Sequence, residues 1–425
     1  MKRLIDNQKS RLLVFVMVAG LLAAISGYYV LKMMKGTIKV GLLHSLTGNL
    51  AFSEKTMVDA ELMAIDEINA KGGLLGKKIV PIVVDGKSDE DVFAQEAERL
   101  IKDEKVMAII GCWTSTSRRT VNQVVEKYDN IFVYPVTSEG AEDSKNLLLI
   151  GASQNQQIVP CALWSFYNLG KRFFLIGSEE IYSHVSQATM KEVLTSVGAE
   201  IVGEEFILLD SVDVAKPLEK ILAAKPDVII NTIQGDAVVP FFEGLRKNGI
   251  TPEKIPVMSV GSVSETEFAQ LGSNAMAGDY VTASYFQSVE REENTIFVTN
   301  FKKRFGADSV VSDWTESAYL SVYMWAEAVK AAQSAEPKKV LAHAYNRVVN
   351  APEGIVYIDN QLLSTWKMIY VGKLRSDGQF SIVWDSGSQI EPLNFPIFKE
   401  KNEWQQFIKD LYVQWGNRWS QVAPG

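Results

Sequence analysis

The turn Gly111-Cys112-Trp113-Thr114-Ser115-Thr116-Ser117 follows directly on an apolar run at 106–110. Its small residues and hydroxyls are typical of the point where a strand ends and a helix begins. In open α/β sheets, ligands bind at the carboxyl ends of parallel strands, and the first N–H groups of the next helix can donate to a ligand oxygen. The turn therefore predicts either a ligand-binding loop or a plain helix cap formed by Thr114 or Ser115.

On both sides of this turn, short β-rich runs alternate with stretches of helical periodicity, which predicts a parallel sheet with right-handed crossovers. The first series has predicted strands at 38–43, 79–84, 106–110 and 131–133, with helices at 57–68, 93–102 and 118–128. The second series has predicted strands at 173–176, 201–208, 228–232 and 257–260, with helices at 185–197, 215–223 and 238–247. The chain is therefore expected to form two similar α/β units, one after the other.

Beyond residue 286 the pattern changes to two long helical stretches, at 295–305 and 315–332, and then to a predicted hairpin. The hairpin joins β-rich runs at 366–374 and 380–384 through a turn that contains Asp377-Gly378, a characteristic hairpin pair. The last apolar residues recur at helical spacing: Trp404, Phe407, Ile408, Leu411 and Trp415. We expect this aromatic face to pack against the core rather than to bind a partner.

The first 36 residues differ from the rest of the chain in composition. Four basic residues precede an uncharged run at 12–31, which is long enough to span a bilayer, and two lysines follow it. Residues 1–36 therefore predict a signal or anchor segment. An uncleaved anchor is favoured over a signal cleaved near Ala24-Ile25-Ser26, and a buried core helix is the third alternative. In the anchored arrangement the rest of the chain lies in the periplasm or an equivalent extracytoplasmic space.

The remainder of the chain is acidic and poor in residues for metal or redox chemistry. Its net charge is −13, against −8 for the whole chain, because the first 36 residues carry six Lys or Arg and one Asp. Such a charge repels nucleic-acid phosphates. Cys112 and Cys161 match no metal-ligand or redox spacing, and the three histidines lie far apart in sequence. We expect no nucleic-acid partner, no metal, no cofactor, and two buried thiols rather than a disulfide.

The ends of the predicted strands carry aromatic, hydroxyl, amide and carboxyl groups, the composition of a pocket for a small polar ligand. The candidate ligand-binding residues are Ser45, Trp113, Thr114, Ser115, Tyr134, Pro135, Val136, Thr137, Glu180, Tyr182, Gln234, Asp236 and Gly261. Each of them alone has a plainer interpretation as a turn, packing or cap residue, and Asp236 for instance could cap the helix that follows it.

Several stretches resemble a known family. Residues 68–79, Ile-Asn-Ala-Lys-Gly-Gly-Leu-Leu-Gly-Lys-Lys-Ile, resemble the amino-terminal signature of the branched-chain amino acid class of ABC transporter binding proteins. Other stretches are similar to the urea and short-chain amide branch of that class: 44–48, 111–118, 134–136, 235–241, 264–267, 352–354 and 380–384. The resemblance covers nearly all of the chain from Ile38 onward.

The resemblance implies a type I periplasmic binding protein, in which two doubly wound α/β lobes joined by three hinge crossings trap a ligand between them. The first lobe would comprise 37–152 and 281–361, and the second 153–280 and 362–398, with a C-terminal amphipathic helix and tail at 399–425. The resemblance also implies that Ser115 and the backbone beside it hold the ligand carbonyl and that Trp113 and Tyr134 form walls. Tyr182 and Asp236 would close on the ligand from the second lobe.

The chain departs from the urea and amide branch at two places. Thr137-Ser138 replaces a segment with an aromatic residue, and Glu180 stands where the branch has a tyrosine, which predicts a larger and more polar pocket. The expected function is a receptor that delivers urea, a short amide or a related small polar solute to an ABC permease. The alternative is a membrane-anchored sensory receptor of the same fold that signals ligand occupancy to a partner.

Catalysis is not expected from this sequence. His44 and Ser45 are the nearest approach to a nucleophile and base, but adjacent residues of a strand point to opposite faces, and no oriented Ser/His/Asp set can be named. We therefore expect a binding protein rather than an enzyme.

Overall fold

The computed structural model describes residue 17 and residues 36–271 and 275–421. The predicted signal or anchor segment at 1–36 therefore lies almost entirely outside the described residues. Within the described ranges, no helix is both long enough and apolar enough to cross a membrane.

The first sheet has five parallel strands in the order β2-β1-β3-β4-β5. Its strands are β1 (Thr37–His44), β2 (Lys78–Asp85), β3 (Ile109–Gly111), β4 (Phe132–Tyr134) and β5 (Leu147–Leu149). The helices between them are α2 (Ala51–Ala70), α3 (Glu90–Lys102) and α4 (Ser115–Lys127). The strands and helices predicted for the first series are confirmed, whereas β5, only three residues long, was not predicted.

The second sheet has seven strands in the order β15-β14-β10-β9-β8-β6-β7, of which β14 and β15 run antiparallel to their neighbours. Its strands are β6 (Arg172–Ser178), β7 (Glu200–Ile207), β8 (Val228–Thr232), β9 (Val257–Val260), β10 (Tyr280–Ala283), β14 (Tyr370–Leu374) and β15 (Phe380–Asp385). The helices around it are α5 (Gln154–Asn168), α6 (Ile181–Ser196), α7 (Ala215–Ala224), the short η1 (Gly235–Ala237), α8 (Val238–Lys247) and α9 (Glu265–Leu271). The second predicted series and the hairpin are confirmed.

The remaining elements are α10 (Glu292–Phe305), α11 (Asp313–Ala332), α12 (Pro337–Ala342), a small antiparallel sheet and α13 (Lys401–Gln414). The small sheet consists of β11 (Val348–Ala351), β12 (Gly354–Ile358) and β13 (Thr365–Trp366). Trp366 therefore belongs to this sheet and not to the hairpin that the sequence predicted to begin there. These strands are too short for an alternation of apolar residues to distinguish them from loops in the sequence.

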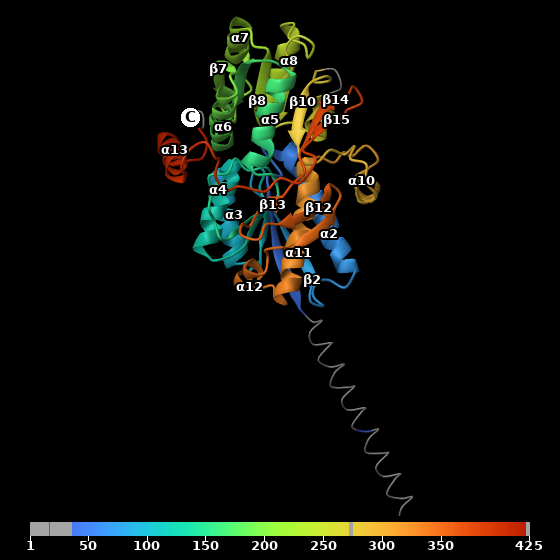
Figure 1. Cartoon of the computed structure of the whole chain (residues 1–425). Helices are drawn as coiled ribbons and strands as arrows, with labels where there is room; N and C mark the ends of the chain where they lie inside the picture. Colours follow the sequence, from blue (N-terminus) through green and yellow to red (C-terminus); the bar gives the residue numbers. More distant parts are fainter. Residues whose placement is uncertain (1–16, 18–35, 272–274, 422–425) are drawn as a thin grey trace, which may run out of the picture.

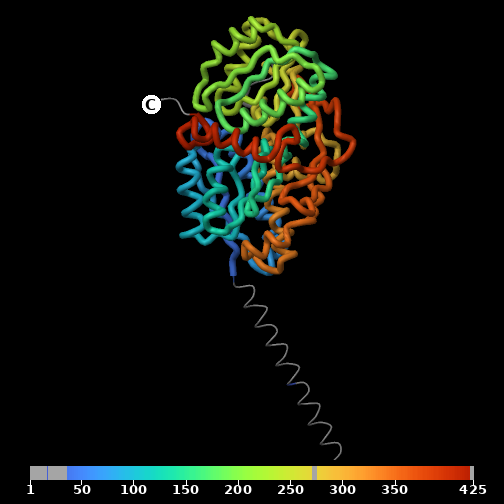
Figure 2. Tube along the Cα trace, turned by 60° about the vertical axis from the view of Figure 1, so that its left-hand side comes forward, coloured from blue at the N-terminus to red at the C-terminus, as the bar shows by residue number. Residues whose placement is uncertain are grey.

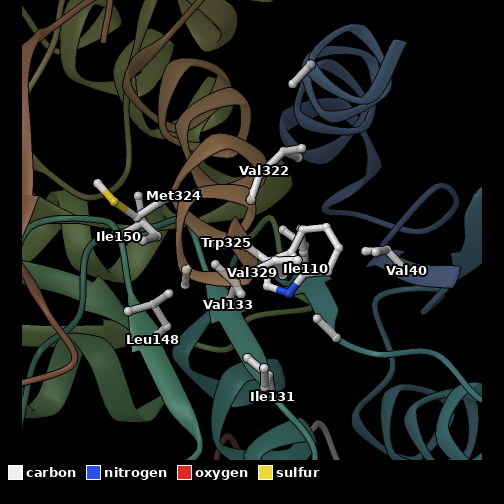
Figure 3. Close-up of a cluster of buried hydrophobic side chains, with 14 of the residues drawn as sticks. Val40, Ile110, Ile131, Val133, Leu148, Ile150, Val322, Met324, Trp325 and Val329 are labelled. Carbon is white, nitrogen blue, oxygen red and sulfur yellow. The ribbon is translucent and has the colours of Figure 1, made fainter. Parts of the chain in front are cut away.

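Helix α11 returns to the first sheet and fills its core. Trp325 is fully buried in one apolar cluster with Ile110 and Val133 of neighbouring strands. Figure 3 shows the Trp325 ring pointing toward the sheet between these residues. The first core is therefore completed by a helix about 190 residues further along the chain than β4.

The two sheets lie one beyond the other, each covered by its own helices (Figure 1). We call the first sheet with its helices α2, α3, α4 and α11 the first lobe, and the second sheet with α5 to α9 the second lobe. The chain passes between the sheets after β5, after β10 and after β13. The change of lobe predicted at residue 281 falls within β10, a strand of the second sheet, and the other lobe boundaries stay predictions.

Candidate ligand-binding site between the lobes

The turn between β3 and α4 is held by backbone geometry and a helix cap. Gly111 and Cys112 have φ angles of +141° and +63°, so the chain reverses sharply before the helix. The Thr114 hydroxyl accepts a hydrogen bond from the N–H of Ser117 at 3.1 Å and thereby caps α4. The structure therefore places the Thr114 side chain in the cap that the sequence offered as the plainer alternative.

The Ser115 side chain belongs to a buried ion-pair network. Its hydroxyl donates to Glu139 Oε2 at 2.5 Å and accepts from Arg118 at 2.7 Å. Arg118 and Arg119 both donate to Glu139 Oε1. Burial raises the pKa of Glu139, but the two arginines outweigh burial and hold it at about 2. The Ser115 hydroxyl is thus occupied within the first lobe, and the expected contact of this turn with a ligand carbonyl, through the backbone, stays a prediction.

Two tryptophans form an aromatic wall above this turn. The Trp113 and Trp314 rings meet edge to face with centroids 5.4 Å apart, and both are almost completely buried. The Nε1–H group of each is buried without a hydrogen-bond partner among the described residues. The Tyr134 hydroxyl donates to the Trp113 carbonyl at 2.6 Å and so holds the turn from behind. Trp113 packs against Trp314, and Tyr134 supports the Trp113 backbone; their roles as walls of a ligand pocket stay predictions.

Tyr182 faces Gly261 at the ends of strands in the second lobe. The Tyr182 hydroxyl is buried and, within the described chain, has no partner. Gly261 has a φ angle of +62°, and a Cβ at this position would lie 2.2 Å from the Tyr182 oxygen. Only glycine allows the tyrosine to reach this place.

Glu180 is a helix cap and not a free carboxylate. Its two oxygens accept from the N–H groups of Tyr182 and Ser183, both at 2.8 Å, at the start of α6. The side chain is fully buried, and burial raises the pKa of Glu180 to about 8 despite these two hydrogen bonds. The structure therefore places Glu180 inside the second lobe, where the sequence had suggested a polar ligand contact.

Three further candidates, Thr137, Gln234 and Asp236, differ in burial and in hydrogen-bond partners. Thr137 is buried and its hydroxyl contacts the Gln157 side chain, which in turn donates to the Thr282 carbonyl. Gln234 is buried and its Oε1 atom has no described partner. Asp236 is exposed on η1 and makes no cap bond, so the cap offered as its plainer interpretation is not formed. Its closing contact with a ligand stays a prediction.

Ser45 and the residues that follow Tyr134 make their contacts within the first lobe. The Ser45 hydroxyl accepts from the N–H of Ser88 at 3.1 Å. Val136 is buried in the apolar cluster behind the turn, next to Pro135. Both ring nitrogens of His44 face buried carboxylates, of Glu54 at 3.3 Å and Glu61 at 2.9 Å, instead of Ser45.

A small cavity of about 10 Å³ adjoins the Trp113–Trp314 and Tyr182–Gly261 pairs, and its lining adds residues that sequence reasoning missed. Its lining includes Gly261, Gln157, Trp314 and Glu265. Glu265 Oε1 accepts from the N–H of Gln287 at 2.8 Å, whereas Oε2 is buried without a described partner. Burial raises the pKa of Glu265 to about 8. Glu265 lies in the 264–267 stretch already singled out by resemblance, but no local signal pointed to Trp314 or Gln157.

Direct contacts join the two lobes on either side of the cleft. The Ser53 hydroxyl of α2 donates to Glu267 of α9 at 2.6 Å. The Asn49 amide donates to the Leu209 carbonyl at 2.9 Å. The candidate site is therefore enclosed by residues of both lobes.

Two further predictions concern the cysteines and metal binding. Cys112 and Cys161 are both buried and unbonded, which confirms the prediction of two thiols. No group of three or more His, Cys, Asp or Glu side chains in the described part of the chain is arranged to hold a metal ion.

Comparison with known proteins agrees with this architecture. The model of a family described as "periplasmic binding protein domain" matches residues 38–401. The Leu/Ile/Val-binding protein BraC3 of Rhizobium johnstonii is 23% identical over 75% of this chain and 86% of its own length. A solved solute-binding protein of an ABC transporter from Rhodopseudomonas palustris, in complex with 3,4-dihydroxybenzoic acid, superposes with a TM-score of 0.76 at 23% identity, covering 82% of this chain and 97% of that one.

A third similarity is local. Over 121 residues, 28% of this chain, the sequence is 39% identical to a protein of Geobacillus stearothermophilus named limonene hydroxylase. The chain covers only 22% of that protein's length. The activity in its name is therefore not transferred to this chain.

The chain belongs to the periplasmic binding protein domain family. The fold is the α/β fold of type I periplasmic binding proteins, and the family consists of substrate-binding proteins of ABC transporters for small ligands. Membership implies an extracytoplasmic location, and the solute-binding relatives are binding proteins rather than enzymes.

Proposed function

We propose that this protein takes up urea, a short-chain amide or a related small polar solute between its two lobes and delivers it to an ABC permease. Family membership supports the receptor and its transporter. The choice of solute rests on one observation about the buried polar groups that have no partner among the described residues. Those of Glu265 and Trp314 line a very small cavity, and those of Trp113 and Tyr182 belong to residues that adjoin its lining.

These groups include both donors and acceptors. The Nε1–H groups of Trp113 and Trp314 can only donate, whereas Glu265 Oε2 accepts when ionised and donates when protonated. The Tyr182 hydroxyl can do either. A buried polar group left unpaired costs about 1–3 kcal/mol, so a ligand that pairs several of them is strongly favoured. A carbonyl next to an NH₂ group offers both functions within a few heavy atoms, as an amide or urea does.

The cavity as it stands is smaller than urea or acetamide, so any solute must separate its walls. About 10 Å³ is close to the minimum needed to hold one water molecule. Urea or acetamide requires only a small separation of the lobes, whereas a solute with a large side chain requires the walls to move apart. No observation favours the sensory alternative. Membrane attachment through residues 12–31 is part of the proposal and rests on composition alone.

Isothermal titration calorimetry on the purified protein tests the solute. Because the best small ligands gain about 1.5 kcal/mol per heavy atom, urea is limited to about 6 kcal/mol, or a Kd of tens of micromolar. We expect Trp113→Phe, which removes the N–H but keeps a ring, to weaken binding about tenfold.

The matched control is Trp325→Phe, because the buried Nε1 of Trp325 also has no partner in the described part of the chain, but Trp325 lies in the core of the first lobe. We expect this variant to bind as the wild type does. Tighter binding of leucine or 3,4-dihydroxybenzoate, with no heat from urea or acetamide, would show that the assigned solute class is wrong.

A further inference from the structure

The segment that follows α13, residues 415–421, contacts both lobes and is called the strap. Figure 2 shows the C-terminal part of the chain, in red, lying at the junction of the two lobes. On one side it pairs with the loop after β6 in the second lobe. The Ile181 N–H donates to the Trp419 carbonyl at 3.0 Å, and the Gln421 N–H donates to the Glu179 carbonyl at 3.0 Å. The strap therefore adds a short antiparallel pairing at the edge of the cleft, centred on a bridge between Glu180 and Ser420.

The same residues contact the first lobe. The Trp419 N–H donates to Glu90 Oε2 at 3.2 Å, and the Thr116 hydroxyl donates to the Trp419 carbonyl at 3.3 Å. The Arg119 guanidinium lies 5.2 Å from the centre of the Trp419 ring. One carbonyl, that of Trp419, thus accepts hydrogen bonds from both lobes.

Arg418 adds the strongest charge contact between the strap and the first lobe. Its Nη2 atom lies 2.5 Å from Asp91 Oδ2, and its Nε atom lies 3.5 Å from Glu90 Oε1. These carboxylates stand in the first turn of α3. Arg418 and Ser420 also border a cavity of about 100 Å³ at the edge of the cleft, which Asn49 of the first lobe and Leu209 of the second share.

The strap is carried by the second lobe. Helix α13 buries an apolar face mainly against α6. The cluster comprises Ile181, Val185, Trp404, Ile408, Leu411 and Trp415, together with one small residue of the first lobe, Ala141. In contrast, the contacts of the strap with the first lobe are an exposed ion pair, single hydrogen bonds and one ring contact, each of which is individually weak. When the lobes separate, the contacts with the first lobe break first.

We propose that the strap is a latch that stays on the second lobe and binds the first lobe only when the lobes are closed. It thereby increases the closed fraction and slows the escape of a trapped solute. The proposal rests on the proposed closure of the lobes around a solute, but not on which solute is bound.

Distance measurements between spin labels on the full chain test the latch without any solute. Labels attached through Gln123→Cys in α4 and Lys216→Cys in α7 occupy exposed positions in different lobes, and the two native cysteines are buried. We expect Arg418→Glu, which faces Glu90 and Asp91 with a like charge, to increase the open fraction at least threefold. Asp91→Arg should do the same, and the double variant should restore the wild-type distances.

The matched control is Arg375→Glu, because Arg375 forms an exposed ion pair with Asp377 within the second lobe. An unchanged distance distribution in Arg418→Glu, equal to that of this control, would overturn the latch. If the charge swap changes the distances while urea and acetamide give no heat, the latch stands and only the assigned solute fails.

Discussion

At the strand ends of this protein, the same types of residue can either bind a ligand or cap and stabilise the lobe itself. Thr114, Ser115 and Glu180 all follow strands, where ligand-binding residues of this fold are expected, yet each is occupied by a cap or an ion pair within its own lobe. A hydroxyl or carboxylate after a strand suits a helix N-terminus as well as a ligand. Only the partners of each atom distinguish the two roles. The unpartnered groups of Trp113, Trp314 and Glu265 are therefore the better candidates for solute contact.

Glu265 also provides a test by pH. Its pKa is about 8 in the folded protein, above the ordinary value of about 4.5, because it is buried. Between these two values the folded state holds a proton that the unfolded state has lost, so this group makes stability fall as pH rises. Glu265→Gln keeps the acceptor for the Gln287 N–H and removes the titration. Chemical unfolding should show the stability of the variant, relative to wild type, increasing from pH 5 to pH 8 by at most about 1.4 kcal/mol per unit.

The control for this measurement is Glu243→Gln on α8, because Glu243 is exposed. Its stability relative to wild type should be the same at both pH values. An equal difference between Glu265→Gln and wild type at pH 5 and pH 8 would contradict the raised pKa.

Among the helices, α13 was predicted correctly from its sequence, but the position of the strap that follows it was not predicted. The spacing of Trp404, Ile408 and Leu411 predicted an apolar face that packs against the core, and all three are buried. Where that face packs is decided by α6, more than 200 residues earlier in the chain. The same docking positions the strap across the cleft.

We expect Ile408→Ala to lower the free energy of unfolding by about 2–4 kcal/mol, because it leaves a cavity between α13 and α6. Val413→Ala on the same helix is the control: Val413 is 60% exposed, so the change should stay within about 0.5 kcal/mol. Denaturant unfolding monitored by circular dichroism measures both. Equal stabilities of the two variants would show that α13 is not docked on α6.

For the whole molecule, a solute held between the lobes must stabilise the folded state. A ligand at 100 times its Kd contributes about 2.7 kcal/mol if it binds only the folded protein. We expect acetamide at millimolar concentration to raise the Tm by a few degrees in a thermal scan; urea is avoided here because it also denatures. An unchanged Tm with acetamide, together with a rise with leucine, would contradict the proposed solute class.

The alternation of strands and helices, the two α/β units, the Asp377-Gly378 hairpin and the final amphipathic helix followed from the sequence alone. Each of these depends on local periodicity or turn chemistry, which neighbouring residues carry by themselves. Helix α5 was not predicted from the sequence, because it begins with four polar residues and contains Pro160, so its helical periodicity is weak.

Only the tertiary structure decided which polar groups are free and which are used. It brought Trp314 beside Trp113, about 200 positions earlier in the chain, and placed Glu265 at the cavity. It also laid the strap over both lobes, with Trp419 bonded to Glu90, about 330 positions earlier. Such contacts depend on how the whole chain closes, and the burial of a polar atom is a property of every element packed around it. Local composition cannot encode that burial.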